Sequence, residues 1–211
     1  MTTALRSDKL VLAVALMFLV CGSCVRAEFY LRPIAQYSIL AGSGSDSTGA
    51  LGGGLSLGAA FGRERRFDIG AEILHTSYNG TYNEPTAYSN QGGWFGNTPI
   101  AWTKVPASYH VTNVLAAFRY SYSDQNTPIR PFIGCVLGVT RVGISKTGIQ
   151  DDGGISFTGG FGGGASFRLG QRTRLDVGYR YVFSSETSAL FSSSNFHYNA
   201  HVLSVALDQR F

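Results

Sequence analysis

The sequence predicts an all-β fold, namely an eight-stranded antiparallel up-and-down transmembrane β-barrel that follows an N-terminal signal peptide. Three observations lead to this prediction. Past Ala27, apolar and polar residues alternate with a period of two, and no window shows the period of an amphipathic helix. Charged residues make up only 14% of the chain, whereas about a quarter is usual for a soluble domain. The connections between the alternating segments are short and long in turn.

The first 27 residues have the features of a secretory signal peptide, and we expect cleavage after Ala27. Basic residues are followed by an apolar run from Leu10 to Val20 and then by small residues. The run of about eleven residues is too short for a membrane-spanning helix, which needs about 20. The remaining chain, 28–211, is expected to form a single barrel domain.

The charge balance of the expected barrel domain is close to neutral. The signal peptide carries three basic residues and one acidic residue, so 14 of the 17 basic and 12 of the 13 acidic residues remain. A balance of +2 is no nucleic-acid signature. We therefore expect no nucleic-acid partner.

Four alternating segments occupy the first half of the barrel domain. Segment 29–39 alternates aromatic and aliphatic residues with Arg, Gln and Ser, and segment 51–61 alternates Leu and Phe with Gly and Ser. Segment 67–73 alternates Phe and Ile with Asp, Gly and Glu, and segment 113–120 alternates Val, Ala, Phe and Tyr with Asn, Leu and Arg. Each of these patterns predicts a β-strand.

Four further segments follow in the second half. They run approximately from Pro131 to Ile144, from Ile155 to Arg168, from Arg174 to Phe183 and from Phe196 to Phe211. The total of eight is an even number, which allows an antiparallel sheet to close into a barrel.

The connections predict how the barrel is oriented. GRERR at 62–66 and GQRT at 170–173 are short, whereas 41–50 and 79–105 are long. The long connections therefore gather at one rim. Bacterial outer-membrane barrels have short periplasmic turns and longer external loops, so we expect the long connections outside the cell.

The apolar faces of the segments are expected to face lipid. The interior of an eight-stranded barrel has room for little more than its own side chains, and the apolar faces hold too many Leu, Ile, Phe and Tyr residues to fit there. The opposite faces are rich in Gly and Ser. The only lysines after the signal peptide, Lys104 and Lys146, fall in predicted loops.

Charged residues support this assignment because most of them share the parity of the small residues in their own strands. Arg141 is an exception, and we expect its head group to reach the membrane interface. Because buried charges are costly unless paired, the inward charges should form a network that closes the lumen, with Glu72 and Arg32, Arg119 or Arg180 at its centre. The expected network consists of Arg32, Asp68, Glu72, Arg119, Arg168, Asp176, Arg180 and Asp208.

Three stretches resemble the small outer-membrane β-barrels of Gram-negative bacteria, the OmpA-like and OmpX-like class. They are RPFIGCVLGV at 130–139, LDVGYRYVF at 175–183 and HVLSVALDQRF at 201–211. The resemblance implies a location in the bacterial outer membrane, contact with outer-membrane lipid, and recognition by the barrel-assembly machinery during biogenesis. Gln209 stands where an aromatic residue is more usual in that class. The implied assembly signal consists of Leu203, Val205, Leu207 and Phe211.

The long connection 79–105 is expected to carry any specific interaction with an extracellular ligand. It contains both tryptophans of the protein, and exposed aromatic residues are common anchors for partners. They could instead pack within the loop or join the aromatic girdle at the lipid boundary. The candidate contact residues are Tyr82, Tyr88, Trp94, Phe95 and Trp102.

A structural or surface-interaction role without catalysis, cofactor or metal is therefore the expected function. One alternative is a passive conduit for small or apolar solutes. A further alternative is a lipid-modifying enzyme, because LHTS places His75 and Ser77 on one outward face, from which they could attack a lipid ester. Some outer-membrane lipid A deacylases look similar, with a His-x-Ser pair near the outer leaflet. Glu84 is the loop candidate for the third member of such a site.

Overall fold

The segments in which apolar and polar residues alternate form β-strands in the structure, which is a computed structural model. It describes residues 27–40, 49–89, 98–124, 126–146, 149–151, 154–185 and 199–211. The predicted signal peptide lies outside these residues apart from Ala27. In the described ranges, no helix is long and apolar enough to cross a membrane. The elements are β1 (Glu28–Leu40), β2 (Gly49–Phe61), the 3-10 helix η1 (Arg63–Arg65), β3 (Phe67–Ser89), β4 (Thr98–Ser121), β5 (Ile129–Lys146), β6 (Ile149–Asp151), β7 (Ile155–Arg168), β8 (Thr173–Ser184) and β9 (Asn199–Arg210).

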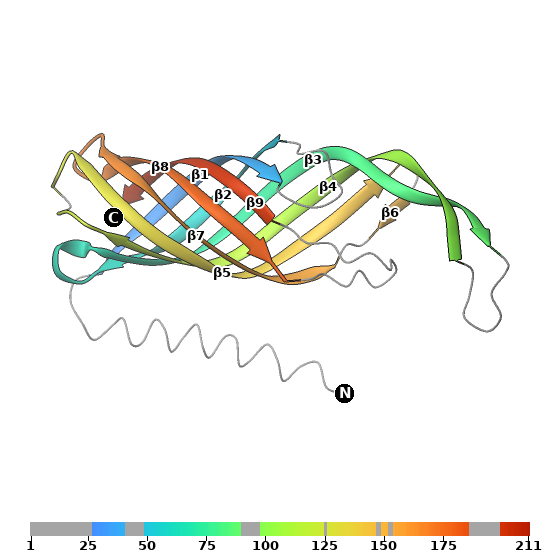
Figure 1. The fold of residues 1–211 in the computed structure, drawn as a ribbon. Helices are drawn as coiled ribbons and strands as arrows, with labels where there is room; N and C mark the ends of the chain where they lie inside the picture. The colour runs from blue at the N-terminus through green and yellow to red at the C-terminus, as the bar shows by residue number, and fades with distance from the viewer. Residues whose placement is uncertain are drawn as a thin grey trace, which may run out of the picture.

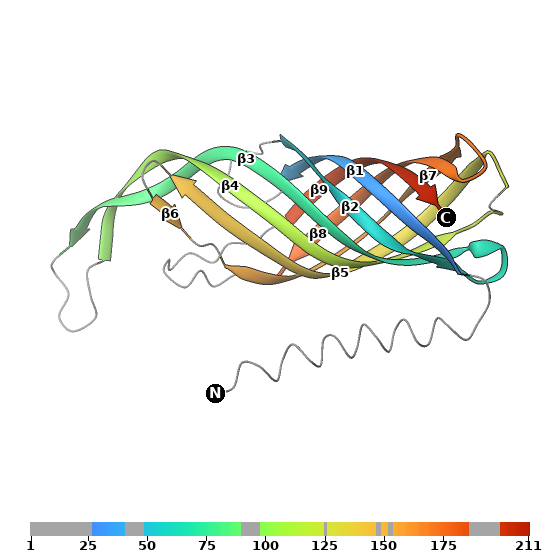
Figure 2. The ribbon, with the colours of Figure 1, turned by 180° about the vertical axis from the view of Figure 1, so that it is seen from behind.

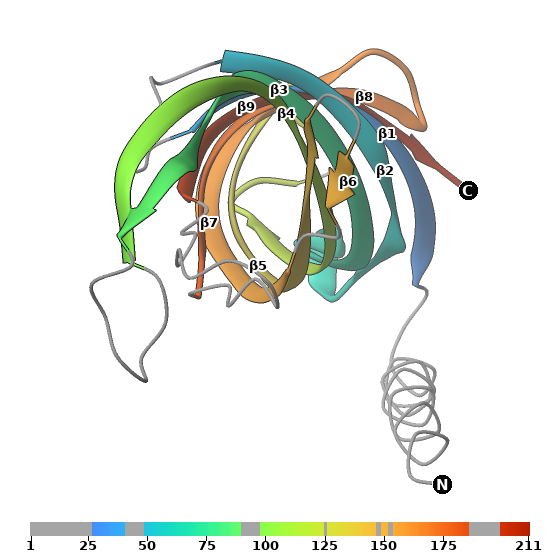
Figure 3. The same ribbon diagram turned by 90° about the vertical axis from the view of Figure 1, so that its right-hand side faces the viewer.

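Eight of the nine strands close into a barrel (Figures 1 and 2). Each pairs antiparallel with its neighbours, and the ring is closed by β1 pairing with β9 and by β4 pairing with β5. Viewed along its axis, the barrel is a complete ring (Figure 3). The short strand β6 pairs with the end of β5, at Ile144–Lys146. The predicted eight-stranded up-and-down barrel is confirmed.

The two faces of the strands are assigned as the sequence predicts. Large apolar side chains point outward and are exposed, as at Ile73, Phe161 and Val205, which are 58%, 61% and 47% exposed. Arg141 on β5 and Lys104 on β4 are the lysine and arginine residues on the outward parity of the described barrel strands. An apolar belt of this kind is stable against lipid rather than water.

Small residues on the inner face make room for the few large side chains that point inward. Tyr30 lies against Gly58 and Gly70, and a Cβ atom at Gly70 would come within 2.6 Å of the Leu57 carbonyl oxygen. The narrow lumen therefore accommodates the Tyr30 ring because glycine stands on β2 and β3 beside it.

The structure corrects the predicted loop 79–105. Strand β3 continues to Ser89 and β4 begins at Thr98, so most of this stretch forms a two-stranded ribbon that extends past the other strands (Figure 1). Turn-forming Asn, Gly and Pro residues suggested a loop. Proline is tolerated at bulges and sheet edges, and the register shifts on either side of Ala87, next to Pro85.

Candidate functional site

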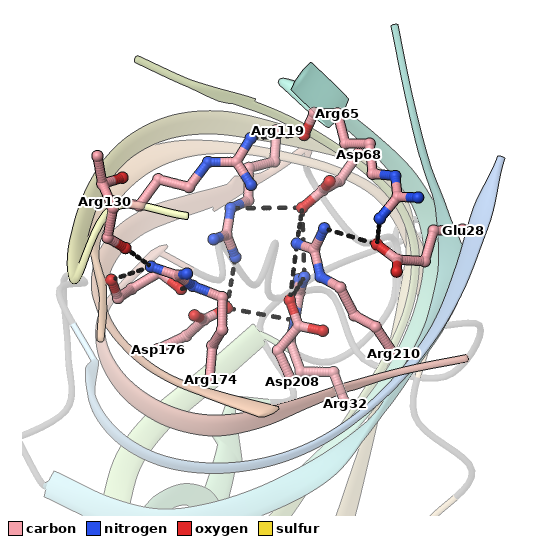
Figure 4. Close-up of polar contacts among 12 residues, drawn as sticks. Glu28, Arg32, Arg65, Asp68, Arg119, Arg130, Arg174, Asp176, Asp208 and Arg210 are labelled. Carbon is pink, nitrogen blue, oxygen red and sulfur yellow. Dashed lines mark hydrogen bonds and ion pairs between the residues drawn. The ribbon is translucent and has the colours of Figure 1, made fainter. Parts of the chain in front are cut away.

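The lumen is closed at its short-turn end, where the connections 62–66, 122–128 and 169–172 lie, by a cluster of paired charges that we call the charged floor (Figure 4). Its arginines and aspartates come from five different strands, and all are largely buried. The members of the charged floor are Arg32, Asp68, Arg119, Asp176, Asp208 and Arg210.

Arg32 contacts all three aspartates of the charged floor. Its Nη2 donates to Asp208 Oδ2 at 3.0 Å and lies 3.4 Å from Asp68 Oδ2, while its Nε lies 3.4 Å from Asp176 Oδ2. Arg119 donates to Asp176, and its Nε lies 3.6 Å from Asp68 Oδ2. Each carboxylate is therefore shared by at least two guanidinium groups, as a desolvated charge requires.

Strand register and aromatic rings position these arginines. Asp68 and Arg119 are direct cross-strand partners on β3 and β4. The guanidinium carbon of Arg32 lies 4.3 Å from the centre of the Tyr30 ring, and that of Arg119 lies 3.8 Å from the centre of the Phe132 ring. These cation–π contacts hold the planar groups in place inside the lumen.

Glu72 pairs with one of the three arginines expected for it, but the pair is not at the centre of the network. Glu72 pairs with Arg180, whose Nη1 donates to Glu72 Oε2 at 2.8 Å, whereas Arg32 and Arg119 pair with aspartates. The pair lines a cavity of about 90 Å³ on the long-loop side of the charged floor. The Arg180 side chain is 26% exposed, and it lines this cavity. The ion pair is therefore less completely desolvated than the charged floor.

Arg168 was also expected in the network, and the structure places it elsewhere. Its guanidinium is exposed and donates to the carbonyl oxygens of Gly170 at 3.2 Å and Asn126 at 3.1 Å. Arg168 has the inward parity, but it is the last residue of β7. At a strand end a long side chain can turn toward water and the neighbouring turn.

Arginines that the sequence analysis did not assign to the lumen also lie at its short-turn end. Arg130, Arg174 and Arg210 are 0%, 3% and 1% exposed. Parity could have found them, because Arg174 and Arg210 alternate with the inward Asp176 and Asp208. Arg210 Nη1 lies 3.6 Å from Glu28 Oε2, and Arg65 Nη1 lies 2.7 Å from the same oxygen.

An apolar layer closes the opposite end of the lumen, which the sequence analysis did not foresee. It is formed where the strands approach the long connections, and seven of the eight barrel strands contribute to it. Such a layer resists the entry of water and ions. Its members are Leu40, Ala50, Tyr78, Val111, Val142, Val182, Ala200 and Val202.

On the outer surface, Ser77 lies between two histidines. Its Oγ lies 3.0 Å from His110 Nδ1 and 3.3 Å from His75 Nε2, and His75 Nδ1 lies 3.0 Å from Thr112 Oγ1. All four side chains lie just past the apolar residues Ile73 and Val114 of the same strands. The predicted pairing of His75 and Ser77 on one outward face is present. Among the described residues, no group of three or more His, Cys, Asp or Glu could hold a metal ion.

The residues of the implied assembly signal lie on or beside β9. Leu203, Val205 and Leu207 are outward and exposed, and Phe211 follows the strand. Gln209 accepts a hydrogen bond from the Thr173 hydroxyl at 2.8 Å. Whether the assembly machinery reads this strand stays a prediction.

The aromatic residues proposed as ligand contacts fall on the ribbon and its tip. The backbones of Tyr82 and Tyr88 lie in β3, and that of Trp102 lies in β4. Trp94 and Phe95 lie outside the described residues. The ribbon therefore carries three of the five candidate residues along its length rather than in a loop.

Solved structures of small outer-membrane barrels share this fold. Neisserial surface protein A matches with a TM-score of 0.62 and 19% identity over 89% of this chain and 100% of its own. Ail, the attachment invasion locus protein of Yersinia pestis, solved in complex with the heparin analogue sucrose octasulfate, matches with a TM-score of 0.53 and 12% identity over the same shares. No protein-family model matches the sequence, and no curated protein matches it. The chain has the closed eight-stranded fold of the small outer-membrane β-barrels.

Proposed function

We propose that the protein is an integral outer-membrane barrel with a structural and surface-interaction role, in which the β3–β4 ribbon is the element that meets partners. The observation that carries this proposal is the pairing of the ribbon. Beyond Thr76, β3 pairs only with β4 among the described residues, and β4 pairs with β5 only from Ala107 onward. Unpaired strand edges can accept a strand from another chain.

The closed lumen supports this role over that of a conduit. The charged floor fills one end of the lumen, the apolar layer fills the other, and the cavity between them measures about 90 Å³. Eight-stranded barrels have interiors that are normally filled by side chains. We expect the purified barrel in a planar bilayer to show no sustained ion conductance. Stable unitary currents would favour the conduit instead.

The surface-interaction role is tested by crosslinking in living cells. A photocrosslinking amino acid at Lys104, which is exposed on the ribbon, should yield a discrete adduct of higher mass with a protein partner. The same amino acid at Val205, on the apolar belt, serves as the control and should yield none. Absence of an adduct from several exposed ribbon positions, in barrels that fold normally, would contradict the role.

A second candidate function, hydrolysis of an acyl ester, is favoured by the geometry around Ser77. In such a reaction His75 Nε2 would take the Ser77 proton while Oγ attacks the ester carbonyl carbon, and the alcohol would leave with that proton. Water would then release the acid from the acyl-serine. Thr112 occupies the position from which a carboxylate usually orients the histidine, which makes its hydroxyl a weaker partner.

This candidate is tested by the mass of the outer-membrane lipids after expression. Loss of an acyl chain with the natural sequence but not with Ser77→Ala would support the hydrolase. Ser108→Ala is the matched control, because Ser108 lies on the same face and bonds to Asn79 rather than to a histidine. Unchanged lipid masses with the natural sequence would rule out the hydrolase, and the surface-interaction role would be the one remaining proposal.

A further inference from the structure

The short-turn end of the lumen holds more positive than negative charge. Three aspartates face five buried guanidinium groups there, while Glu28 and Arg65 at the rim balance each other. The excess is two positive charges, and a guanidinium keeps its charge inside proteins. The aspartates are Asp68, Asp176 and Asp208, and the arginines are Arg32, Arg119, Arg130, Arg174 and Arg210.

Arg130 is the member of this group whose charge is least compensated. Its side chain is fully buried, and its Nη2 donates to the backbone carbonyl oxygen of Arg65 at 2.5 Å. Its Nε and Nη1 have no hydrogen-bond partner among the described residues. No described carboxylate lies within ion-pair distance of it, in contrast to Arg32, Arg119 and Arg210.

The surroundings of Arg130 increase its need for an anion. Besides the carboxylates of Asp68 and Asp124, the charges that act on it are those of Arg119, Arg174 and Arg210. Figure 4 shows the Arg130 side chain reaching from β5 across the lumen beside Arg119. Arg119 Nη2 and Arg210 Nε are also buried without a hydrogen-bond partner among the described residues. Several unused donors therefore lie in one net-positive region.

We propose that Arg130, together with Arg119 and Arg210, forms a binding site for a small inorganic oxyanion such as phosphate at the short-turn end of the lumen. Guanidinium groups bind tetrahedral oxyanions through charge-assisted N–H donors. The unused Nε and Nη1 of Arg130 lie on different sides of its guanidinium, so the anion would accept from one of them and from the unused Arg119 Nη2 and Arg210 Nε. The enclosed position inside the barrel selects a free ion over a lipid head group. The site is independent of the ribbon and of Ser77.

If Arg130 binds an anion, the effect of Arg130→Met on the stability of the barrel should have opposite signs without and with phosphate. Without an anion, Arg130 is a buried charge that lacks a partner, so Arg130→Met should raise the stability of the barrel. With phosphate bound, the same substitution should lower stability relative to the natural sequence. A purely structural arginine that holds the Arg65 carbonyl would give a loss of stability under both conditions.

The test is equilibrium unfolding in urea of the barrel refolded in lipid vesicles, with sodium phosphate varied and sodium gluconate keeping the ionic strength constant. Above the dissociation constant, each tenfold increase in phosphate should raise the folding equilibrium constant of the natural sequence about tenfold. Arg130→Met should show no such dependence. Arg168→Met, which removes an exposed arginine at the same end, should respond as the natural sequence does.

Two results would overturn the proposal. One is a natural-sequence barrel whose unfolding midpoint does not change with phosphate, which would mean that the region holds water only. The other is an Arg130→Met barrel that keeps the full dependence. If Arg130→Met does not refold, Arg130→Lys replaces it, because a lysine retains the charge but loses the Nε and Nη1 donors of the guanidinium. Broadening of the phosphate ³¹P resonance by the natural sequence should then be weakened by Arg130→Lys, and equal broadening would refute the site.

Discussion

At the scale of single residues, burial decides how much each lumen charge contributes. The Asp208 side chain is fully buried and is shared by Arg32 and Arg210, at 3.0 Å and 3.2 Å. Among the described residues, the Glu72 side chain has one ion-pair partner, Arg180, which borders the lumen cavity. Removing a carboxylate is most costly when it leaves a cation with neither water nor a counter-charge.

The first prediction compares these two carboxylates. Asp208→Ala should lower the free energy of unfolding by about 3 to 5 kcal/mol because it strips two buried arginines of a partner. Glu72→Ala should cost about 1 to 3 kcal/mol because water in the cavity can solvate Arg180. Urea unfolding in lipid vesicles measures both values. A larger loss for Glu72→Ala would show that the cavity is dry.

A second prediction concerns the turns, where the ion pairs are solvent-exposed. Hydrogen bonds with Glu64 and then with Arg66 hold the pKa of the Asp124 carboxyl below its ordinary value of 3.8. A carboxyl whose pKa is lower in the folded state than in the unfolded state stabilises the fold at any pH above its unfolded-state pKa. This contribution is lost as the pH falls through its folded-state pKa. Asp124→Asn lacks it at every pH. The difference in unfolding midpoint between natural sequence and variant should therefore shrink from about pH 7 to about pH 3. A difference that grows on acidification would contradict the assignment.

At the scale of elements, the inward glycines decide how closely neighbouring strands and rings approach. Gly70 on β3 lies against Tyr30, and an added Cβ would overlap both the ring hydroxyl and the Leu57 backbone. Gly143 on β5, which has the outward parity, has open space, because its nearest neighbours belong to His110 at 3.9 Å and beyond. The two glycines thus differ in packing although both lie in barrel strands.

The third prediction uses this contrast. Gly70→Ala should destabilise the barrel by about 1 to 3 kcal/mol through overpacking, whereas Gly143→Ala should change stability by less than about 0.5 kcal/mol. Unfolding of the two variants side by side checks it. Equal effects would mean that the Tyr30 ring can move aside at no cost.

The elements also show which parts of the fold the sequence can predict. The strands from Ile155 to Arg168 and around Arg174–Phe183 follow from alternation alone, because lipid outside and a narrow lumen inside impose opposite requirements on successive residues. The ribbon could not be found in this way. Both faces of the ribbon lie beyond the apolar belt, so neither face has to be apolar and its sequence shows no period of two. Its prolines and glycines are also typical of loops.

At the scale of the whole molecule, parity predicted that charges point inward but not which charges meet. Partners depend on the shear of the barrel, which brings β1, β3, β8 and β9 together at Arg32 and sends Glu72 to Arg180 instead. Arg168 departs from its parity because its strand ends there. Sequence alternation alone carries neither the shear nor the direction of a side chain at a strand end.

The fourth prediction concerns topology across the membrane. If the long connections lie outside the cell, protease added to intact cells should cut within 79–105 and spare the turns 62–66 and 170–173. The ribbon extends past the barrel rim and offers cleavable backbone, whereas the short turns are held by ion pairs such as that of Arg66 with Asp124. Cleavage at Arg65 in sealed cells would reverse the orientation.

The central claim is that the apolar face of the barrel faces lipid, and strand β8 tests it most directly. Val177 is 41% exposed between Ala165 and Val205, and its neighbour Gly178 faces the lumen beside Ser204. In lipid vesicles, Val177→Arg should lower the free energy of unfolding by about 2 to 4 kcal/mol and Val177→Leu should be tolerated, while Gly178→Leu should cost about 1 to 3 kcal/mol by overpacking. A harmless Val177→Arg together with a damaging Val177→Leu would mean that this face packs against protein or water, and the membrane-barrel account would be wrong.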